Sequence, residues 1–421
     1  MAPTQRTRPA LLILAATIVG LYLFHILFRP FAGLDFSIYR MGAMTIFDNE
    51  GFTKELYDRS MVTIGELQLP FTYPPFAAMV FVPFAFLPFE LGYAIMLSIT
   101  CAAAWWVSAL IYDHVQKRGY RIYKQDVYGR TGTIALLTAL VLLSGPWLRT
   151  FDLGQINPII LLLVLADFMR PATRVPRGVL IGIAGGLKLT PLAFGLVLLM
   201  RRDFKGVMTL GLSFGATVAL GFALMPAEAH TFWFSAVSDP ARVGDINFVD
   251  NISIQGWLAH FGMTGSLLKY SYYALAALSI VLAALALYQL NRRKLVLAEI
   301  SVAGMLMVSL SPISWSHHNV WLPIIIAVLA VDAFPLFFKV FPAWLQKLAR
   351  VLFWVGAVGL FISPRAVGGA TWGSMDNLEH LWAPGVLIGG LPIFALWCVV
   401  IVLWGASSCT RQIRSESVQT L

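Results

Sequence analysis

Long apolar runs alternate with short polar segments along most of the chain. The first run extends from about residue 9 to residue 28, which matches the ~20 residues that a helix needs to cross the hydrocarbon core of a membrane. No small-x-small cleavage site follows it, so we expect a retained first span and not a signal peptide. Further apolar runs predict spans at about 132–147, 159–169, 207–225, 264–290, 297–310, 320–334, 351–362 and 383–405.

Two apolar blocks are interrupted. Pro83 and Pro88 divide the block at about 74–112, whose flanking loops require an odd number of crossings, so one piece of it is expected not to cross fully. The block at 178–200 contains Lys188 at its centre and is basic on both flanks. Two short helices that meet at Lys188 satisfy this pattern, because a helix broken at membrane depth has to line a cavity.

Composition supports a membrane protein. Of the 421 residues, 58% are hydrophobic and only 12% are charged, whereas a soluble domain carries about 25% charged residues. The mean hydropathy of +0.76 agrees. Since open backbone cannot be satisfied in hydrocarbon, we expect an all-α polytopic fold of roughly 12 transmembrane helices, with short outer-face loops and interfacial helices. One such helix is predicted after the first span, around residues 38–46.

Basic residues identify the cytoplasmic face. The net charge of +9 is concentrated in short loops, which in a membrane protein marks the cytoplasmic side and does not indicate nucleic-acid binding. This orientation places both termini inside a multi-pass plasma (inner) membrane protein. We expect residues 1–405 to form a single transmembrane domain and residues 406–421 a cytoplasmic tail. The basic loops lie at 114–130, 170–177, 201–205, 291–294 and 339–350.

The remaining polar motifs fall on the opposite, outer face. They are Asp35 after the first span, Tyr73, a polar turn at 149–157, Lys188, a segment at 250–256 and the histidine pair in 314–318. Several of these have a purely structural explanation: a helix cap for Asp35, a long side chain that reaches an interface for Lys188, a rigid entry to a helix at Tyr73-Pro74-Pro75, or interfacial anchoring for the histidines. The tryptophans, too, are expected to be interfacial anchors: Trp147, Trp233, Trp257, Trp315 and Trp321. Convergence of unrelated motifs on one face is what favours a site.

Group transfer between lipids is the chemistry that suits these residues. A carboxylate at Asp35 can take a proton from an attacking hydroxyl, and Lys188 with nearby His or Arg can stabilise a phosphate leaving group. The chain contains no Asp-x-Asp pair, no phosphate-binding glycine loop and no dinucleotide fingerprint. We therefore expect a lipid-phosphate donor, no cofactor and no metal. A transporter that uses Lys188 as a midplane site, or a scaffold protein, are the alternatives.

Five segments resemble glycosyltransferases of the GT-C class, family 87, the polyprenyl-phosphate-mannose-dependent α-mannosyltransferases of mycobacteria and corynebacteria. The likeness is to the type that adds an α-1,2-mannose to phosphatidylinositol mannosides, with the branching enzymes of lipomannan and lipoarabinomannan second. The matching segments occur in the family's order: Asp35-Phe36-Ser37-Ile38-Tyr39, Leu69-Pro70-Phe71-Thr72-Tyr73-Pro74-Pro75, Phe151-Asp152-Leu153-Gly154-Gln155-Ile156-Asn157, Gly186-Leu187-Lys188-Leu189-Thr190-Pro191 and Ser311-Pro312-Ile313-Ser314-Trp315-Ser316-His317-His318.

The resemblance implies an inverting transfer on the periplasmic face, with Asp35 as general base. It implies a polyprenyl-phosphate-mannose donor, a phosphatidylinositol mannoside or lipomannan acceptor, and contact with membrane lipids. Donor-phosphate contacts are expected from Lys188, His317, His318 and Arg149. Substrate contacts are expected from Tyr39, Tyr73, Asp152, Gln155, Asn157, Asn251, Gln255 and Trp315. The sequence departs from the family pattern at one place that bears on the acceptor. Asp250-Asn251-Ile252-Ser253 stands where the family often has an Asn-Gln-Ser run.

Overall fold

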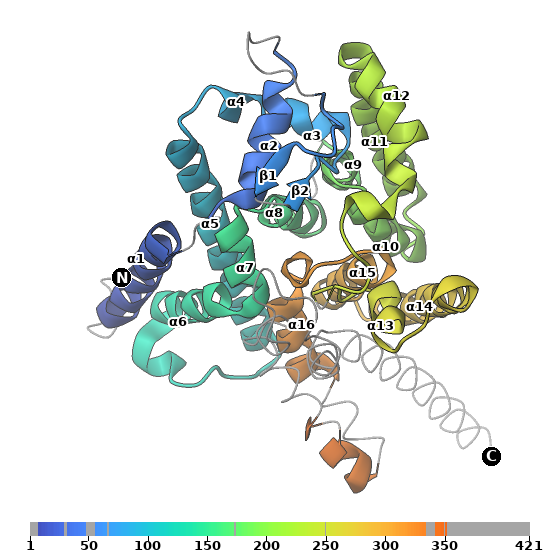
Figure 1. Cartoon of the computed structure of the whole chain (residues 1–421). Helices are drawn as coiled ribbons and strands as arrows, with labels where there is room; N and C mark the ends of the chain where they lie inside the picture. Colours follow the sequence, from blue (N-terminus) through green and yellow to red (C-terminus); the bar gives the residue numbers. More distant parts are fainter. Residues whose placement is uncertain are drawn as a thin grey trace, which may run out of the picture.

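The computed structural model describes residues 7–28, 32–47, 55–64, 67–171, 174–248, 250–333, 342–348 and 350–351. This part of the chain is almost entirely helical (Figure 1), and its sheet is a single antiparallel hairpin. The spans predicted from residue 351 onward and the predicted tail lie outside the described residues, apart from residue 351 itself.

Five helices in the described part are long and apolar enough to cross a membrane. Leu12 and Phe28 on the first of these are each 70% exposed, an exposure that suits hydrocarbon and would be costly in water. These five are α1 (Thr7–Phe28), α5 (Phe89–Lys117), α6 (Gln125–Leu143), α11 (Phe204–Leu224) and α14 (Gly265–Arg292).

A bent pair raises the number of candidate spans to six. Helices α7 (Gly145–Leu153) and α8 (Asn157–Met169) meet at 118°. The predicted polar turn at 149–157 was therefore partly wrong, because residues 149–153 complete α7 and the chain turns only at Gly154, which has φ 65°. The hydropathy pattern cannot distinguish a polar loop from a helix whose polar side chains are buried by neighbouring elements.

The block at 74–112 contains one candidate span, α5, preceded by two very short helices. Prolines explain the division: Pro75 begins α3, Pro83 lies in the first turn of α4, and Pro88 is the N-cap of α5. One candidate span in this block agrees with the prediction that one piece does not cross fully, which stays a prediction. The elements between α1 and α5 are α2 (Leu34–Met44), β1 (Val62–Ile64), β2 (Leu67–Leu69), α3 (Pro75–Val80) and α4 (Val82–Ala85). Strand β1 pairs with β2, with Val62 opposite Leu69.

The block at 178–200 is broken at Lys188, as predicted. Helix α9 (Val179–Leu187) ends there, because Lys188 has extended backbone angles of φ −154° and ψ 131°. A 3-10 turn, η1 (Thr190–Phe194), and α10 (Gly195–Met200) complete the block. Proline at the second position of η1 prevents α9 from continuing, since its ring would clash with the preceding turn.

Helix α15 (Val296–Leu310) lies at the centre of the C-terminal half, where all but two of its residues are buried. Two predicted interfacial anchors are also in the core, because Trp147 and Trp321 are 0% and 1% exposed. That prediction was wrong for these two residues, whose rings fill space between helices. The other elements are α12 (Pro226–Phe234), η2 (Ala236–Ser238), η3 (Pro240–Arg242), α13 (Ile254–His260), η4 (Ser316–His318), α16 (Leu322–Val328) and the π-helical η5 (Leu329–Ala333).

Candidate active site

The start of α2 positions Asp35. Gly33 is the N-cap of α2 with φ 73°, and its N–H donates to the carbonyl of Asp152 at 2.7 Å. A side chain at Gly33 would meet the ring of Phe89 at 2.9 Å, so glycine satisfies both the backbone angle and the close approach. Asp35 thereby lies in the first turn of α2, against the end of α7. The N-cap is Gly33 and Asp35 lies within the first turn, where its carboxylate accepts from Gln155, so Asp35 is not the N-cap of this helix.

Gln155 connects the carboxylate of Asp35 to three other site residues. Its amide nitrogen donates to Oδ2 of Asp35 and lies 3.2 Å from Nε2 of His317. Its carbonyl oxygen accepts the hydroxyl hydrogen of Tyr39 at 2.9 Å. An ionised carboxylate only accepts, so the nitrogen end of the amide is the end that faces Asp35. The hydroxyl of Tyr73 lies 3.0 Å from that of Tyr39. Gln155 is 2% exposed, so this network is shielded from solvent.

Arg149 and Asp152 form an ion pair behind Asp35. The guanidinium of Arg149 lies 2.5 Å from the carboxylate of Asp152, one helical turn further along α7. The other carboxylate oxygen of Asp152 lies 3.6 Å from Nε2 of His25. His25 is not among the predicted site residues, although a histidine in the last turn of an otherwise apolar span is a recognisable signal of a polar partner.

Lys188 faces the histidine pair from the break after α9. Its amino group lies 3.0 Å from Nε2 of His318 and 3.4 Å from the side-chain oxygen of Asn157. The same amino group is 5.7 Å from the ring centre of Tyr73, within the range of a cation–π contact. The amide of Asn157 also donates to the carbonyl of His317 at 3.0 Å. Asn157 therefore contacts both Lys188 and residues 314–318, which we call the histidine segment.

The segment that carries the histidines is held from behind by Asn251. The side-chain oxygen of Asn251 accepts N–H groups from Ser314 and Ser253, and its amide donates to the carbonyls of Ile246 and Pro312. Asn251 is 0% exposed. All of these contacts are with backbone groups, so Asn251 lies behind the loop and shapes it.

Trp315 and Gln255 lie further from the carboxylate. Trp315 forms an isolated β-bridge with Asn251, and its ring contacts that of Phe248 at 5.5 Å. Gly244 lies beneath the same ring, where an added side chain would come within 2.7 Å of it. Gln255 is half-buried on α13. Gln255 belongs to the segment between α12 and α14, and Trp315 belongs to the segment between α15 and α16 that carries the histidines.

Besides raising the pKa of Tyr39 and Tyr73, the environment shifts the pKa of three groups that bear on charge in the site, all outside the candidate spans. Burial raises the pKa of Asp35 to about 6, although the charge of Arg149, the hydrogen bond from Gln155 and the charge of Lys188 act in the opposite direction. Burial also lowers the pKa of Lys188 to about 8. Burial, assisted by the charge of Lys188, holds the pKa of His318 well below its usual range. Near neutral pH the site thus contains a carboxylate, an ammonium and a neutral imidazole.

A small cavity lies beside the lysine. Its walls combine polar groups from α8, the break after α9 and the histidine segment with apolar side chains from α15 and the start of α16. An ammonium and a neutral imidazole in such a cavity can hold a phosphate oxygen or a sugar hydroxyl. The lining residues are Asn157, Ile160, Lys188, Thr190, Met307, Val308, Ser314, His318, Val320 and Trp321.

The arrangement combines a base with a cationic pocket. Asp35, with a pKa near neutrality, is suited to accept a proton. Lys188 in the cavity and Arg149, which is paired with Asp152, both act on Asp35 by their positive charge. Within the described ranges, no group of three or more His, Cys, Asp or Glu side chains has the arrangement of a metal site.

Comparison with known proteins identifies similar sequences over most of the chain. The sequence profile of glycosyltransferase family 87 matches residues 71–312. A polyprenol-phosphate-mannose-dependent alpha-(1-2)-phosphatidylinositol mannoside mannosyltransferase of Mycolicibacterium smegmatis is 31% identical over 72% of this chain and 70% of its own length. A protein of the same name from Mycobacterium tuberculosis is 28% identical over 86% of this chain and 85% of its own.

A second group of relatives has a related name. A polyprenol-phosphate-mannose-dependent alpha-(1-2)-phosphatidylinositol pentamannoside mannosyltransferase of Mycobacterium tuberculosis is 33% identical over 76% of this chain and 72% of its own length. No solved structure matches the chain.

Proposed function

The chain belongs to glycosyltransferase family 87, and we propose that it transfers mannose from polyprenol-phosphate-mannose to a phosphatidylinositol mannoside, forming an α-1,2 linkage. Two observations support this. Relatives over most of the chain have names that specify this donor and this class of acceptor. The site also combines a single base with cations suited to a phosphate leaving group.

Asp35 is the general base in this proposal. The carboxylate takes the proton of the acceptor 2-hydroxyl as its oxygen forms a bond to the anomeric carbon. The bond from that carbon to the phosphate oxygen breaks on the opposite face, and its electrons leave with the polyprenyl phosphate. A β-linked mannosyl phosphate thus becomes an α-mannoside. The raised pKa of Asp35 supports this role, since a base works best when its pKa is near the operating pH.

Lys188 and Arg149 receive the leaving phosphate. A phosphate monoester leaves as an anion, so it needs charge stabilisation and does not need a second acid. Lys188 provides this charge in the cavity with His318 as its neutral partner, and His317 faces the same region through Gln155. Hydrogen bonds within a largely buried site are worth more to a developing charge than the same bonds in water.

The remaining site residues orient the sugars and the loop. Tyr39, Tyr73 and Gln155 hold the carboxylate in place, and Asn157 holds the lysine. Asn251 acts through the histidine segment. In this proposal Gln255, on α13, and Trp315, next to the histidine pair, contact the acceptor.

The fold in this proposal is of the GT-C class with roughly 12 transmembrane helices, both termini in the cytoplasm and the site on the periplasmic face. The distribution of charge supports this orientation. The α5–α6 and α8–α9 connections are rich in Arg and Lys, and α8 separates the latter connection from Asn157 in the site. Three shorter apolar helices, Thr190–Met200, Val296–Leu310 and Leu322–Asp332, supply further candidates for the count.

Transfer by the purified protein in lipid nanodiscs tests this function. The protein is given radiolabelled polyprenol-phosphate-mannose with phosphatidylinositol mannosides of different length, or with lipomannan. We expect a labelled glycolipid with one additional α-1,2-mannose, and no product from a nucleotide-mannose donor. If the protein forms no glycolipid in nanodiscs but moves polyprenol-phosphate-mannose across the bilayer of sealed proteoliposomes, the transporter alternative is correct. The preferred acceptor distinguishes mannoside elongation from lipomannan branching.

A further inference from the structure

Helices α8 and α9 form an antiparallel pair with polar contacts at both ends. At the site end, Asn157 begins α8 and Lys188 follows α9. At the opposite end, Asp167 lies in the last turn of α8 and Gly178 is the N-cap of α9. In each helix the polar residues of the two ends are about 15 Å apart, at a rise of ~1.5 Å per residue.

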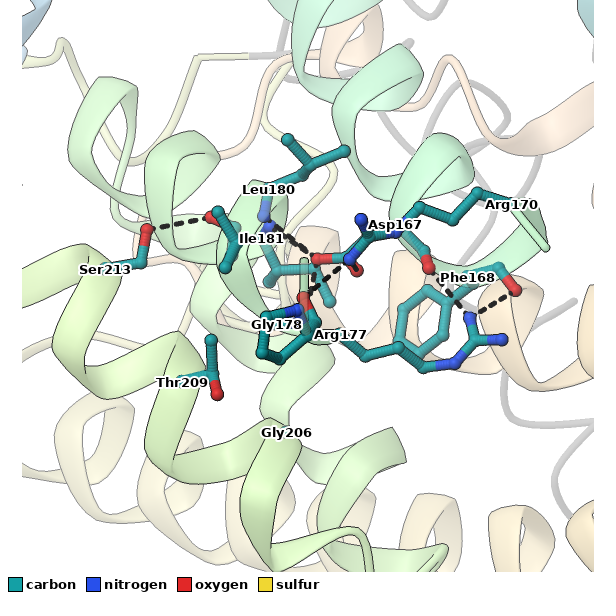
Figure 2. Close-up of polar contacts among 12 residues, drawn as sticks. Asp167, Phe168, Arg170, Arg177, Gly178, Leu180, Ile181, Gly206, Thr209 and Ser213 are labelled. Atoms are coloured by element: carbon teal, nitrogen blue, oxygen red, sulfur yellow. Dashed lines mark hydrogen bonds and ion pairs between the residues drawn. The ribbon is translucent and has the colours of Figure 1, made fainter. Parts of the chain in front are cut away.

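Asp167 binds the N-terminus of α9. Its Oδ2 accepts the backbone N–H groups of Gly178, Leu180 and Ile181 at 2.9, 3.0 and 3.1 Å, as Figure 2 shows. The side chain is 0% exposed. Its other oxygen pairs with Arg170 at 3.1 Å. A buried carboxylate at this position satisfies N–H groups that the first turn of a helix leaves without partners and complements the helix dipole.

Arg177, which precedes the N-cap residue of α9, makes further contacts at the same junction. The guanidinium of Arg177 donates to the carbonyls of Asp167 and Phe168 at 2.8 Å each, which are among the last carbonyls of α8 (Figure 2). The end of α8 and the beginning of α9 are thus tied together by donors and acceptors from both sides. Sliding α9 along α8 would break this set of bonds together.

Sideways movement of α9 is blocked by α11. Gly178 has φ 94°, and an added side chain would come within 2.2 Å of the carbonyl of Gly206. Gly182 has the same close approach to the carbonyl of Leu210, at 2.6 Å. The hydroxyl of Ser213 donates to the carbonyl of Val179 at 2.8 Å. Backbone contact with α11 therefore fixes α9 laterally, and Asp167 fixes it along its axis.

We propose that Asp167 is a positioning residue, which sets the register of α9 along α8 and so places Lys188 beside Asn157 and His318. The inference rests on the proposed role of Lys188. A slip of one residue moves a helical position by ~1.5 Å along the axis and turns it by about 100°. Such a slip would separate the amino group of Lys188 from the imidazole that lies 3.0 Å away.

The test compares Asp167→Asn with Asp332→Asn. Asp332 is a matched control, because its carboxylate is also buried and forms ion pairs, with His114 and Arg118 at the end of α5, whereas the contacts that hold α9 come from α8 and α11. Two quantities are measured on the full chain in nanodiscs: the KM and kcat for polyprenol-phosphate-mannose, and the labelling of Lys188 by a small amine-acylating reagent as a function of pH, read by mass spectrometry.

Asp167→Asn should raise the donor KM about tenfold with a smaller change in kcat. It should also move the labelling midpoint of Lys188 from about 8 toward the ~10.4 of an unburied lysine. The control should change neither quantity. If Asp167→Asn lowers the melting temperature but leaves the labelling midpoint and the KM unchanged, Asp167 is only a structural cap and the proposal is wrong.

The labelling readout keeps this proposal separate from the proposed function. A shifted midpoint with an unchanged transfer rate would support positioning by Asp167 and contradict the role of Lys188 in donor binding. If Asp167→Asn does not accumulate in the membrane, Asp167→Glu replaces it, since the carboxylate remains but is displaced by one methylene group. That variant should shift the midpoint in the same direction by a smaller amount, and an unchanged midpoint would overturn the proposal.

Discussion

The amino group of Lys188 lies 3.0 Å from Nε2 of His318. An ammonium only donates, so Nε2 of the imidazole accepts and the ring proton is on Nδ1, which lies 3.4 Å from the hydroxyl of Ser314. Burial and the adjacent charge hold the pKa of His318 low enough for this neutral form to persist. The pair therefore presents one positive charge to the cavity, and Lys188 carries it.

Removal of that charge should weaken donor use. We expect Lys188→Ala to reduce kcat/KM for polyprenol-phosphate-mannose about 100-fold, on the scale of losing one charge-stabilising donor. Lys205→Ala is the matched control, because Lys205 is an exposed lysine at the start of α11. Steady-state kinetics of both variants measures the effect. Equal kcat/KM values for Lys188→Ala and the control would contradict the phosphate-binding role.

The pH profile of kcat/KM should be bell-shaped. The base must be ionised, so activity is lost as the pH falls through the pKa of Asp35, about 6. The cation must be protonated, so activity is lost as the pH rises through the pKa of Lys188, about 8. Lys188→Arg should remove the alkaline limb, because a guanidinium stays protonated. An alkaline limb that persists in Lys188→Arg would assign that limb to another group.

Gln155→Leu should move the acid limb. The amide of Gln155 stabilises the ionised form of Asp35, so its loss raises the pKa of that carboxyl and shifts the acid limb above about 6. We also expect kcat to fall by about tenfold as the carboxylate loses its orientation. Gln255→Leu, on α13, has no contact with Asp35 and should leave the limb in place. If the acid limb of Gln155→Leu stays at the wild-type pH, the hydrogen bond from Gln155 to Asp35 does not form in solution.

Asn251→Ala should destabilise the histidine segment. It leaves buried backbone groups around Ser314 and Ser253 without their partner, at a cost of about 1–3 kcal/mol each. Thermal unfolding should occur at a lower temperature, with kcat and KM changed together. Asn247→Ala, at an exposed asparagine nearby, provides the comparison. Unchanged stability with a selective loss of acceptor affinity would instead favour direct contact of Asn251 with the acceptor.

Much of the architecture was predictable, because local chemistry determined it. The break at Lys188 follows from a lysine and a proline inside an apolar run, and the division before α5 follows from its prolines. The predicted helix after the first span is present as α2, although it begins earlier, at Leu34, and its buried side includes Phe36 and Tyr39. Apolar spacing alone does not reveal which face of a short helix packs against the protein.

The rest depended on contacts between distant segments. His25 meets Asp152 across more than one hundred residues, and Asp167 caps a helix other than its own. The backbone partners of Asn251 likewise come from a separate segment. Hydropathy reports the environment of a residue along the chain and contains no information about these pairings. The sequence therefore indicated several residues that lie in contact with one another, but not which of them support the others.

The role of Asp35 is tested most directly by the transfer rate of Asp35→Asn with saturating polyprenol-phosphate-mannose and phosphatidylinositol mannoside. Glu90→Gln is the matched control, because it removes an exposed carboxylate close to α2. Glu90 follows Phe89, whose ring contacts that of Phe36, the residue after Asp35. General-base catalysis contributes about 10²–10⁴ in rate, so kcat of Asp35→Asn should fall by at least about 100-fold with donor binding retained, while Glu90→Gln keeps the wild-type rate. An Asp35→Asn rate within about threefold of the wild type would contradict the assignment of Asp35 as the base.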